Sequence, residues 1–227
     1  MSTIFGAEHL LALAVVAVLI ATQTAVARRW PGPWLLPFLA ALGGVLLVAE
    51  ATWWVYLAVR GMWTPAAGLP LQLCDAGALV VVAALWWRRP LLVELSWFWG
   101  LAGSVQALLT PDLPQHFPEW WFFQYYLVHG AIVSSAILLV IALGAVPRPG
   151  SVRRVFLLTL AYAVLVGVID QVTGGDYMYL RRPPPVHTLL DLMGPWPWYL
   201  VSGAALAVGL FWLLDAPFRA HRRMPAP

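Results

Sequence analysis

The residues best suited to chemistry are one cysteine and one histidine, both inside apolar segments. Cys74 is the only cysteine, which excludes an intramolecular disulfide and a four-cysteine metal site. A thiol becomes a good nucleophile when a neighbouring base promotes thiolate formation, and histidine is the usual base. Cys74 and His129 are therefore the candidate catalytic residues, with the histidine acting as base and then as acid.

Each of these residues also has an ordinary structural interpretation. A lone cysteine in an apolar helix usually behaves as a small hydrophobic side chain, and His129 can be a neutral imidazole bonded to a carbonyl. Metal binding is the weaker alternative, because no two of the five histidines have the close spacing of paired metal ligands. We expect neither a metal nor a cofactor.

The composition indicates a membrane protein. The chain is 62% hydrophobic and only 10% charged, with a mean hydropathy of +0.80. A soluble domain is roughly one quarter charged, and 227 residues cannot bury this much apolar surface. In lipid, each crossing segment must be a helix of about 20 residues that satisfies its own backbone hydrogen bonds. We expect a single transmembrane domain over residues 1–227 and no soluble module.

Apolar runs interrupted by proline and glycine indicate where the crossings lie. They predict an all-α fold, a polytopic membrane helix bundle of seven transmembrane helices. Tryptophans crowd the ends of the runs, where an amphipathic ring lies best between headgroups and hydrocarbon. The spans are expected near residues 8–26, 34–59, 69–87, 91–109, 120–143, 155–172 and 196–214.

The arginines predict the orientation. All thirteen basic residues are arginine, and ten follow the odd-numbered spans, against three on the other side, Arg60, Arg181 and Arg182. The positive-inside rule then places the N-terminus outside and the C-terminus in the cytoplasm. Arg28 and Arg29 follow the first span, whereas a cleaved signal peptide carries its charge before the apolar run, so this span is expected to be retained. The net charge of +3 indicates leaflet anchoring and no nucleic-acid partner.

With this topology, most polar side chains within the spans lie toward the outer face. Such groups are costly in lipid and usually face a bundle interior or a watery cavity, although any single one can be a hydrogen bond between helices. Their common depth favours a shared polar cavity, in which Asp75 or Gln72 orients the histidine or stabilises an oxyanion. The supporting residues are Gln72, Asp75, Glu50, Gln106, Gln124 and Asp170, and Glu94 near the inner face is the exception.

A lipid substrate must enter such a cavity from the side, between helices. Aromatic residues near the start of the last span are the candidates for the rim of this opening, and two arginines there could meet a phosphate headgroup. The alternative for these residues is an ordinary aromatic belt with interfacial anchors. The rim candidates are Tyr177, Tyr179, Arg181, Arg182, Trp196 and Trp198.

Five blocks of the sequence resemble a known membrane family. They are residues 69–75 (LPLQLCD), 98–112 (FWGLAGSVQALLTPD), 126–130 (YLVHG), 176–180 (DYMYL) and 194–199 (GPWPWY). Together they resemble the YwaF-like (TP0381-type) bacterial integral membrane family, which is similar to the eukaryotic transmembrane protein 164 family of phospholipid acyltransferases. The resemblance implies a multi-pass protein of the bacterial cytoplasmic membrane. It also implies a cysteine acyl-enzyme, with Cys74 and His129 at the matching positions.

We therefore expect a lipid-directed acyltransferase or acyl-ester hydrolase that works at the outer leaflet, with membrane lipids as its surroundings and substrate. The alternative is a transporter or receptor that binds a small polar ligand in the same cavity, with Glu50 and Asp170 as proton or cation sites. A purely structural role is the third possibility. The sequence indicates neither the acyl donor and acceptor nor the oligomeric state.

Overall fold

A computed structural model of the chain describes residues 6–184 and 189–223, and every regular element in those ranges is helical. The elements are α1 (Ala7–Arg29), α2 (Leu35–Val59), α3 (Leu73–Trp87), α4 (Pro90–Trp99), η1 (Gly100–Ser104), α5 (Val105–Leu109), α6 (Trp120–Ile141), α7 (Ser151–Thr173), η2 (Tyr177–Tyr179), η3 (Leu189–Met193) and α8 (Trp198–Arg223). The prediction of an all-α fold is confirmed.

Six helices in the described part of the chain are long and apolar enough to cross a membrane. They are α1, α2, α6, α7, α8 and the continuous helical segment Pro90–Leu109. The seventh, α3, is equally apolar but has only 15 residues. At about 1.5 Å per residue it extends about 22 Å, less than the roughly 30 Å of a hydrocarbon core.

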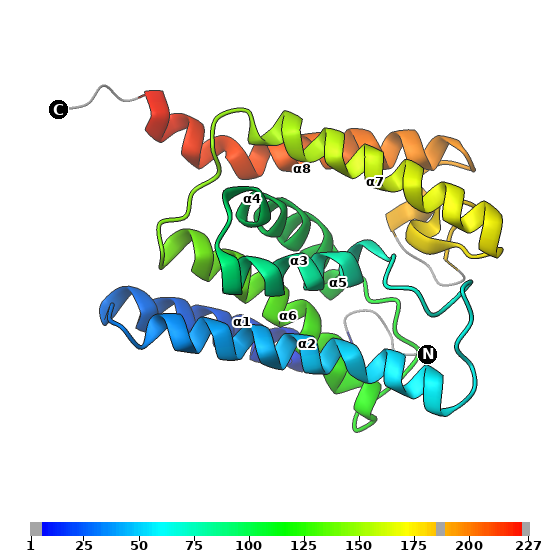
Figure 1. Cartoon of the computed structure of the whole chain (residues 1–227), viewed down its shortest axis with the longest axis horizontal. Helices are drawn as coiled ribbons and strands as arrows, with labels where there is room; N and C mark the ends of the chain where they lie inside the picture. Colours follow the sequence, from blue (N-terminus) through cyan, green and yellow to red (C-terminus); the bar gives the residue numbers. More distant parts are fainter. Residues whose placement is uncertain (1–5, 185–188, 224–227) are drawn as a thin grey trace.

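The helices lie side by side along the long axis of the molecule, with α1 and α2 on one side, α7 and α8 on the other, and α3, α4 and α6 between them (Figure 1). We call the end where α3 begins the Cys74 end. Helix α6 occupies the centre, with 72% of its apolar stretch buried against 11% for α1. Gly130 and other small residues of α6 permit this close packing, because a Cβ at Gly130 would meet Val16 Cγ1 of α1 at 3.0 Å.

The buried apolar side chains form two main groups around α6. In the first, Leu39 and Leu46 of α2 pack with Leu85 of α3 and Ile132 of α6. In the second, Phe98 of α4 packs with residues of α7 and α8. Lipid tails are as apolar as these side chains, so close van der Waals packing is what distinguishes this interior from its surroundings.

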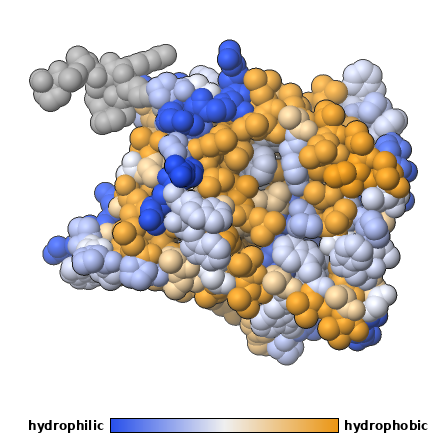
Figure 2. Space-filling model, viewed as in Figure 1, coloured by the Kyte–Doolittle hydropathy of each residue, from blue (hydrophilic) through white to orange (hydrophobic). Residues whose placement is uncertain are grey.

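The outer surface is that of a membrane protein. Large apolar side chains remain exposed along α1, α2, α7 and α8, including Val164 and Val172 of α7. On the face shown in Figure 2, apolar residues cover most of the surface and strongly hydrophilic residues lie mostly toward its edges. A surface of this kind is stable in contact with lipid tails rather than with water.

The third span begins later than predicted. The sequence placed its start at residue 69, whereas α3 begins at Leu73 and residues 69–72 are not helical. Pro70 explains this in part, since proline disfavours helical geometry in the residue before it. This non-helical backbone is satisfied in part by two distant hydroxyl groups: Leu69 N–H donates to Tyr177, and Tyr162 donates to Leu71 O. Non-helical backbone at membrane depth is stable where protein supplies such partners.

Other boundaries differ by a few residues. Helix α6 ends at Ile141 instead of 143, and α7 begins at Ser151 instead of 155. Helix α8 begins at Trp198 instead of 196 and continues to Arg223 instead of 214, with Pro217 inside it. At the start of α7 and the end of α8 the helix extends past the apolar run, because charged and polar residues can continue a helix beyond the hydrocarbon.

The fourth span contains a π-helix. Residues Gly100–Ser104 form this segment between α4 and α5, without a break in the helical rod. Gly100 lies against α6, where a Cβ would meet Ile132 Cγ2 at 3.1 Å. π-helical segments of this kind are uncommon and frequently occur at functional sites.

At the end of the bundle opposite Cys74, a buried acid is fully paired. Glu94 of α4 is 1% exposed and accepts hydrogen bonds from Arg148 Nε at 2.7 Å and from Arg154 Nε at 3.0 Å. Burying an isolated carboxylate is costly, and two guanidinium groups offset that cost. The cluster ties the connection between α6 and α7 to α4.

Candidate functional site

Cys74 lies in the first turn of α3 and is half-buried. Gln72, with an extended backbone, is the residue that precedes the helix, and its N–H donates to the side chain of Asp75. This is one half of a capping box, in which the third helical residue satisfies a free N–H at the helix start. The carboxyl groups of Asp75 and Glu50 are close enough for their charges to act on the Cys74 thiol.

Asp75 and Glu50 form a carboxyl pair beside Cys74. The Glu50 side chain, on α2, is buried and shares a hydrogen bond with that of Asp75. Two ionised carboxylates have no hydrogen to share, so a hydrogen bond between them requires at least one proton on the pair. The two carboxyl groups thus lie next to each other on neighbouring helices, beside the thiol.

His129 lies on α6 and is 8% exposed. Its Nδ1 is 2.8 Å from the carbonyl oxygen of Tyr125, and its ring packs on the Tyr125 ring at 4.2 Å between centroids. A carbonyl can only accept, so Nδ1 carries the hydrogen and Nε2 keeps the lone pair of the neutral ring. The backbone of α6 thus fixes both the orientation of the imidazole and the nitrogen that can accept a proton.

Tyr125 lies near both Cys74 and His129. Its ring covers the imidazole, and its phenol is close enough to Cys74 for the two groups to interact electrostatically. The phenol donates to Ala107 O of α5 at 2.8 Å, which fixes the ring. Within the described residues, no hydrogen bond joins the Cys74 sulfur to the imidazole. Tyr125 therefore packs on His129 and lies within electrostatic range of Cys74.

The connection at residues 174–182 closes the Cys74 end. Tyr177 is buried: its N–H donates to Asp170 Oδ1 at 3.0 Å and its hydroxyl to Pro65 O at 2.9 Å. Met178 N–H donates to Gln72 Oε1 at 2.8 Å, one residue before α3. These bonds join the end of α7 to the non-helical segment that leads into Cys74.

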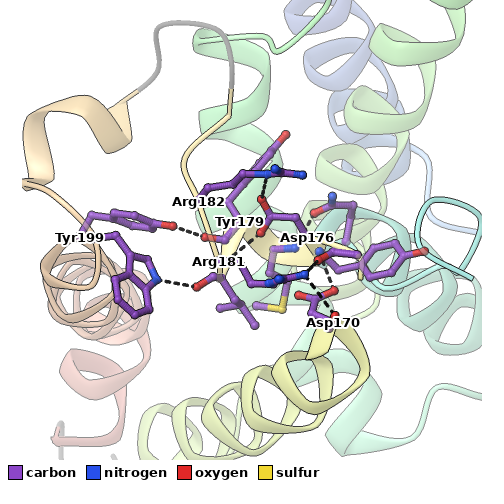
Figure 3. A network of polar contacts seen from close by, with 12 residues as sticks. Asp170, Asp176, Tyr179, Arg181, Arg182 and Tyr199 are labelled. Carbon is purple, nitrogen blue, oxygen red and sulfur yellow. Dashed lines mark hydrogen bonds and ion pairs between the residues drawn. The ribbon is translucent and has the colours of Figure 1, made fainter. Parts of the chain in front are cut away.

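Tyr179 and its neighbours form a second layer of the same network (Figure 3). The Tyr179 hydroxyl donates to Asp112 Oδ2 at 2.6 Å, and its carbonyl accepts from the hydroxyl of Tyr199. Burial, the hydrogen bond to Asp112 and nearby charges, including that of Cys74, raise the pKa of Tyr179. Tyr179 is thus a neutral hydrogen-bond donor close to the thiol.

The two arginines predicted to meet a headgroup are bound to the connection itself (Figure 3). The Arg181 guanidinium donates to Gly175 O at 3.0 Å, and its backbone N–H donates to Asp176. Arg182 Nε pairs with Asp176 Oδ2 at 3.1 Å. Both arginines therefore stabilise the fold of residues 174–182.

The remaining predicted residues lie in different surroundings. Gln124 donates to Ala49 O of α2 at 3.3 Å and joins two helices. Asp170 is fully buried at the end of α7 and holds the 174–182 connection. Gln106 lies in α5, where its carbonyl accepts the N–H of Thr110. The Trp196 indole donates to Leu180 O at 3.0 Å, and Trp198 is exposed at the start of α8.

Three residues of the site were missed by the sequence analysis. Tyr125 precedes His129 by one helical turn, a spacing that places the two rings on one face and could have revealed it. Tyr162 and Asp112 act through bonds to Leu71 and Tyr179. Their partners are distant in sequence, so no local pattern points to them.

The comparisons with known proteins agree with this architecture. Residues 4–215 match the TMEM164 family, which confirms the resemblance to the transmembrane protein 164 family. Neither the comparison with curated proteins nor that with solved structures gave a match. Since the family match spans nearly all the apolar helices, the chain is a multi-pass membrane protein that belongs to the TMEM164 family.

Proposed function

We propose that this protein is a phospholipid acyltransferase or a thiol acyl hydrolase with Cys74 as nucleophile and His129 as base. The observation that carries the proposal is the position of Tyr125, which lies within electrostatic range of the Cys74 thiol and covers an imidazole whose Nε2 is left to accept a proton. In this proposal, a rotamer change of the half-buried thiol in the first turn of α3 brings it to the ring.

The reaction follows from these positions. His129 Nε2 takes the thiol proton, and the Cys74 sulfur attacks the carbonyl carbon of an acyl ester to give a tetrahedral oxyanion. Collapse breaks the ester C–O bond, and the imidazolium protonates the departing alcohol, which leaves a thioester on Cys74. A second alcohol, or water, then gives its proton to His129 and attacks the thioester, so the thiol is restored.

The polar residues around Cys74 stabilise the negative charge that develops on the oxyanion and on the thiolate. The Gln72 side-chain NH2 and the backbone N–H groups at the start of α3 are donors near the thiol, suited to an oxyanion. The proton held between Glu50 and Asp75 lowers the negative charge beside a thiolate. These residues act as supports, and the bond changes occur at Cys74.

A second function is favoured by the same carboxyl pair. A protonated Glu50–Asp75 pair within apolar helices has the character of a coupling site in a proton-dependent transporter. Cys74→Ser distinguishes the two functions: binding and transport tolerate the exchange of sulfur for oxygen, whereas acyl transfer through a thioester does not.

We further propose seven crossings in a bacterial cytoplasmic membrane, with α3 and residues 69–72 together forming the third, the N-terminus outside and the C-terminus inside. In a Cys74→Ala background, single cysteines at Pro114 and Pro149 test this orientation, since both positions are exposed in connections at opposite ends of the bundle. An impermeant maleimide applied to intact cells is expected to label position 114 and to spare 149 until the cells are lysed. The reverse pattern would move the site to the inner leaflet.

The covalent step is tested with the wild-type protein in nanodiscs. After incubation with a phosphatidylcholine that carries an isotope-labelled acyl chain, we expect one acyl group on the peptide that contains Cys74, released by neutral hydroxylamine as thioesters are. Product formation with the label on a serine or threonine instead would contradict a thiol acyl-enzyme.

A further inference from the structure

An open groove runs along the seam between α2 and α6 at the Cys74 end. Its volume is about 560 Å³, and its lining includes Val48, Thr52, Val55 and Val59 of α2 with Trp120 and Trp121 of α6. From Val48 to Val59 the helix rises about 16 Å, the depth of one leaflet of a roughly 30 Å hydrocarbon core. The sequence analysis expected an opening near residues 177–198, and the groove lies on other helices.

One wall of the groove is a fixed aromatic cluster. Trp121 meets the rings of Trp53 and Tyr56 edge-on, with centroids 5.2 and 4.9 Å apart. One turn further along the seam, the hydrogen bond from Gln124 to Ala49 O joins α6 to α2. The aromatic contacts and the hydrogen bond hold α2 and α6 in place. Neither helix can move into the groove without breaking them, so the groove stays open.

Arg60 stands at the polar end of the groove, directly after α2. Its guanidinium lies 5.8 Å from the centroid of the Tyr56 ring, and in the described residues it makes neither an ion pair nor a hydrogen bond. Arg181 and Arg182, by contrast, are engaged by carbonyl groups and by Asp176. Among the described arginines at this end of the bundle, Arg60 is therefore the one whose guanidinium is available to bind an external anion.

We propose that this groove binds one glycerophospholipid, with its phosphate on Arg60 and an acyl chain along the valines of α2. The groove has a cation at one end and apolar side chains along the rest of its length. A phospholipid in a leaflet has the matching arrangement, with its phosphate at the headgroup level and its acyl chains in the hydrocarbon. The binding site goes beyond the proposed catalysis and does not depend on it, since the groove lies on the lipid-facing side of the α2–α6 seam and Cys74 is on α3.

The test uses the full-length protein in nanodiscs with a phosphatidylglycerol that bears a photoactivatable group on its acyl chain. We expect crosslinks concentrated on the α2 peptide, reduced about fivefold by Arg60→Gln, since one basic residue contributes about that factor at a membrane surface. Ala51 of α2 also lines the groove, so Ala51→Trp fills it and is expected to remove most of the labelling. A matched diacylglycerol probe, without phosphate, should lose the dependence on Arg60.

Two control variants separate this site from general lipid contact. Arg182→Gln removes an arginine at the same end, and Val164→Trp adds the same bulk at an exposed position of α7. Both are expected to keep wild-type labelling of α2, and gel filtration and thermal melting check folding. Equal labelling of α2 and α7, or labelling of α2 that survives both Arg60→Gln and Ala51→Trp, would overturn the proposal. So would crosslinks that join two copies of the chain across this groove.

Discussion

Cys74→Ala is expected to lower the acyl-transfer rate by a factor of roughly 10⁴ or more, because the only thiol in the chain, the proposed nucleophile, is lost. The side chain is small and only half-buried, so the change leaves the packing of α3 nearly intact. Release of labelled fatty acid and transfer to an acceptor alcohol, followed by mass spectrometry, measure the loss.

Cys74→Ser is the sharper variant of the same experiment. Serine keeps the size and the hydrogen bonding of the side chain but has a far less acidic proton, so a histidine without an ionised partner activates it poorly. We expect little activity and unchanged binding of the phosphatidylglycerol probe in the groove. Wild-type turnover in both variants would exclude the thioester mechanism and leave the carboxyl-pair transporter as the better interpretation.

His129→Asn is expected to slow formation of the acyl-enzyme by about 10² to 10⁴-fold, the usual contribution of a positioned general base. The asparagine amide can still donate to the Tyr125 carbonyl, as Nδ1 does, so the local backbone bond is kept while the proton acceptor is lost. Rapid-quench measurement of the first turnover isolates this step from release of the product.

The matched control is His9→Asn, which changes another buried histidine, one that contacts the Tyr126 hydroxyl at 2.8 Å. It is expected to affect thermal stability and to leave acylation within about twofold, since its contact lies on the α1 side of α6. If both variants slow acylation equally, His129 acts through the packing of α6 and not as a base.

The sequence predicted the helices well because membrane helices are specified by local composition. Each of the long spans is a run of apolar residues that must satisfy its own backbone, so neither strands nor distant partners compete. The start of α3 was predicted wrongly for the opposite reason. Residues 69–72 resemble the apolar run that follows, but hydroxyl groups from Tyr162 and Tyr177 stabilise a non-helical backbone there.

The site was predictable only in part. Cys74 and Asp75 stand out by residue type, yet the pairing of Asp75 with Glu50 joins two helices and has no signature in either segment. Arg181 and Arg182 resemble headgroup ligands in the sequence, whereas Asp176, five and six residues earlier, binds both. In the sequence, Arg60 also resembles a headgroup ligand. Only the structure shows that its guanidinium, unlike those of Arg181 and Arg182, makes no ion pair or hydrogen bond with the described part of the chain.

The π-helix at Gly100–Ser104 has a consequence for how the fourth span is compared with those of its relatives. A π-turn accommodates one more residue than an α-turn, and each residue of an α-helix turns by about 100°. A helical wheel drawn through Pro90–Leu109 therefore assigns wrong faces to every position after Ser104, Gln106 included. For a relative whose fourth span lacks the π-turn, an alignment with a one-residue gap within Gly100–Ser104 keeps the faces of both halves in correspondence. The same gap placed before the π-turn would match the residues between the gap and the π-turn to the wrong face.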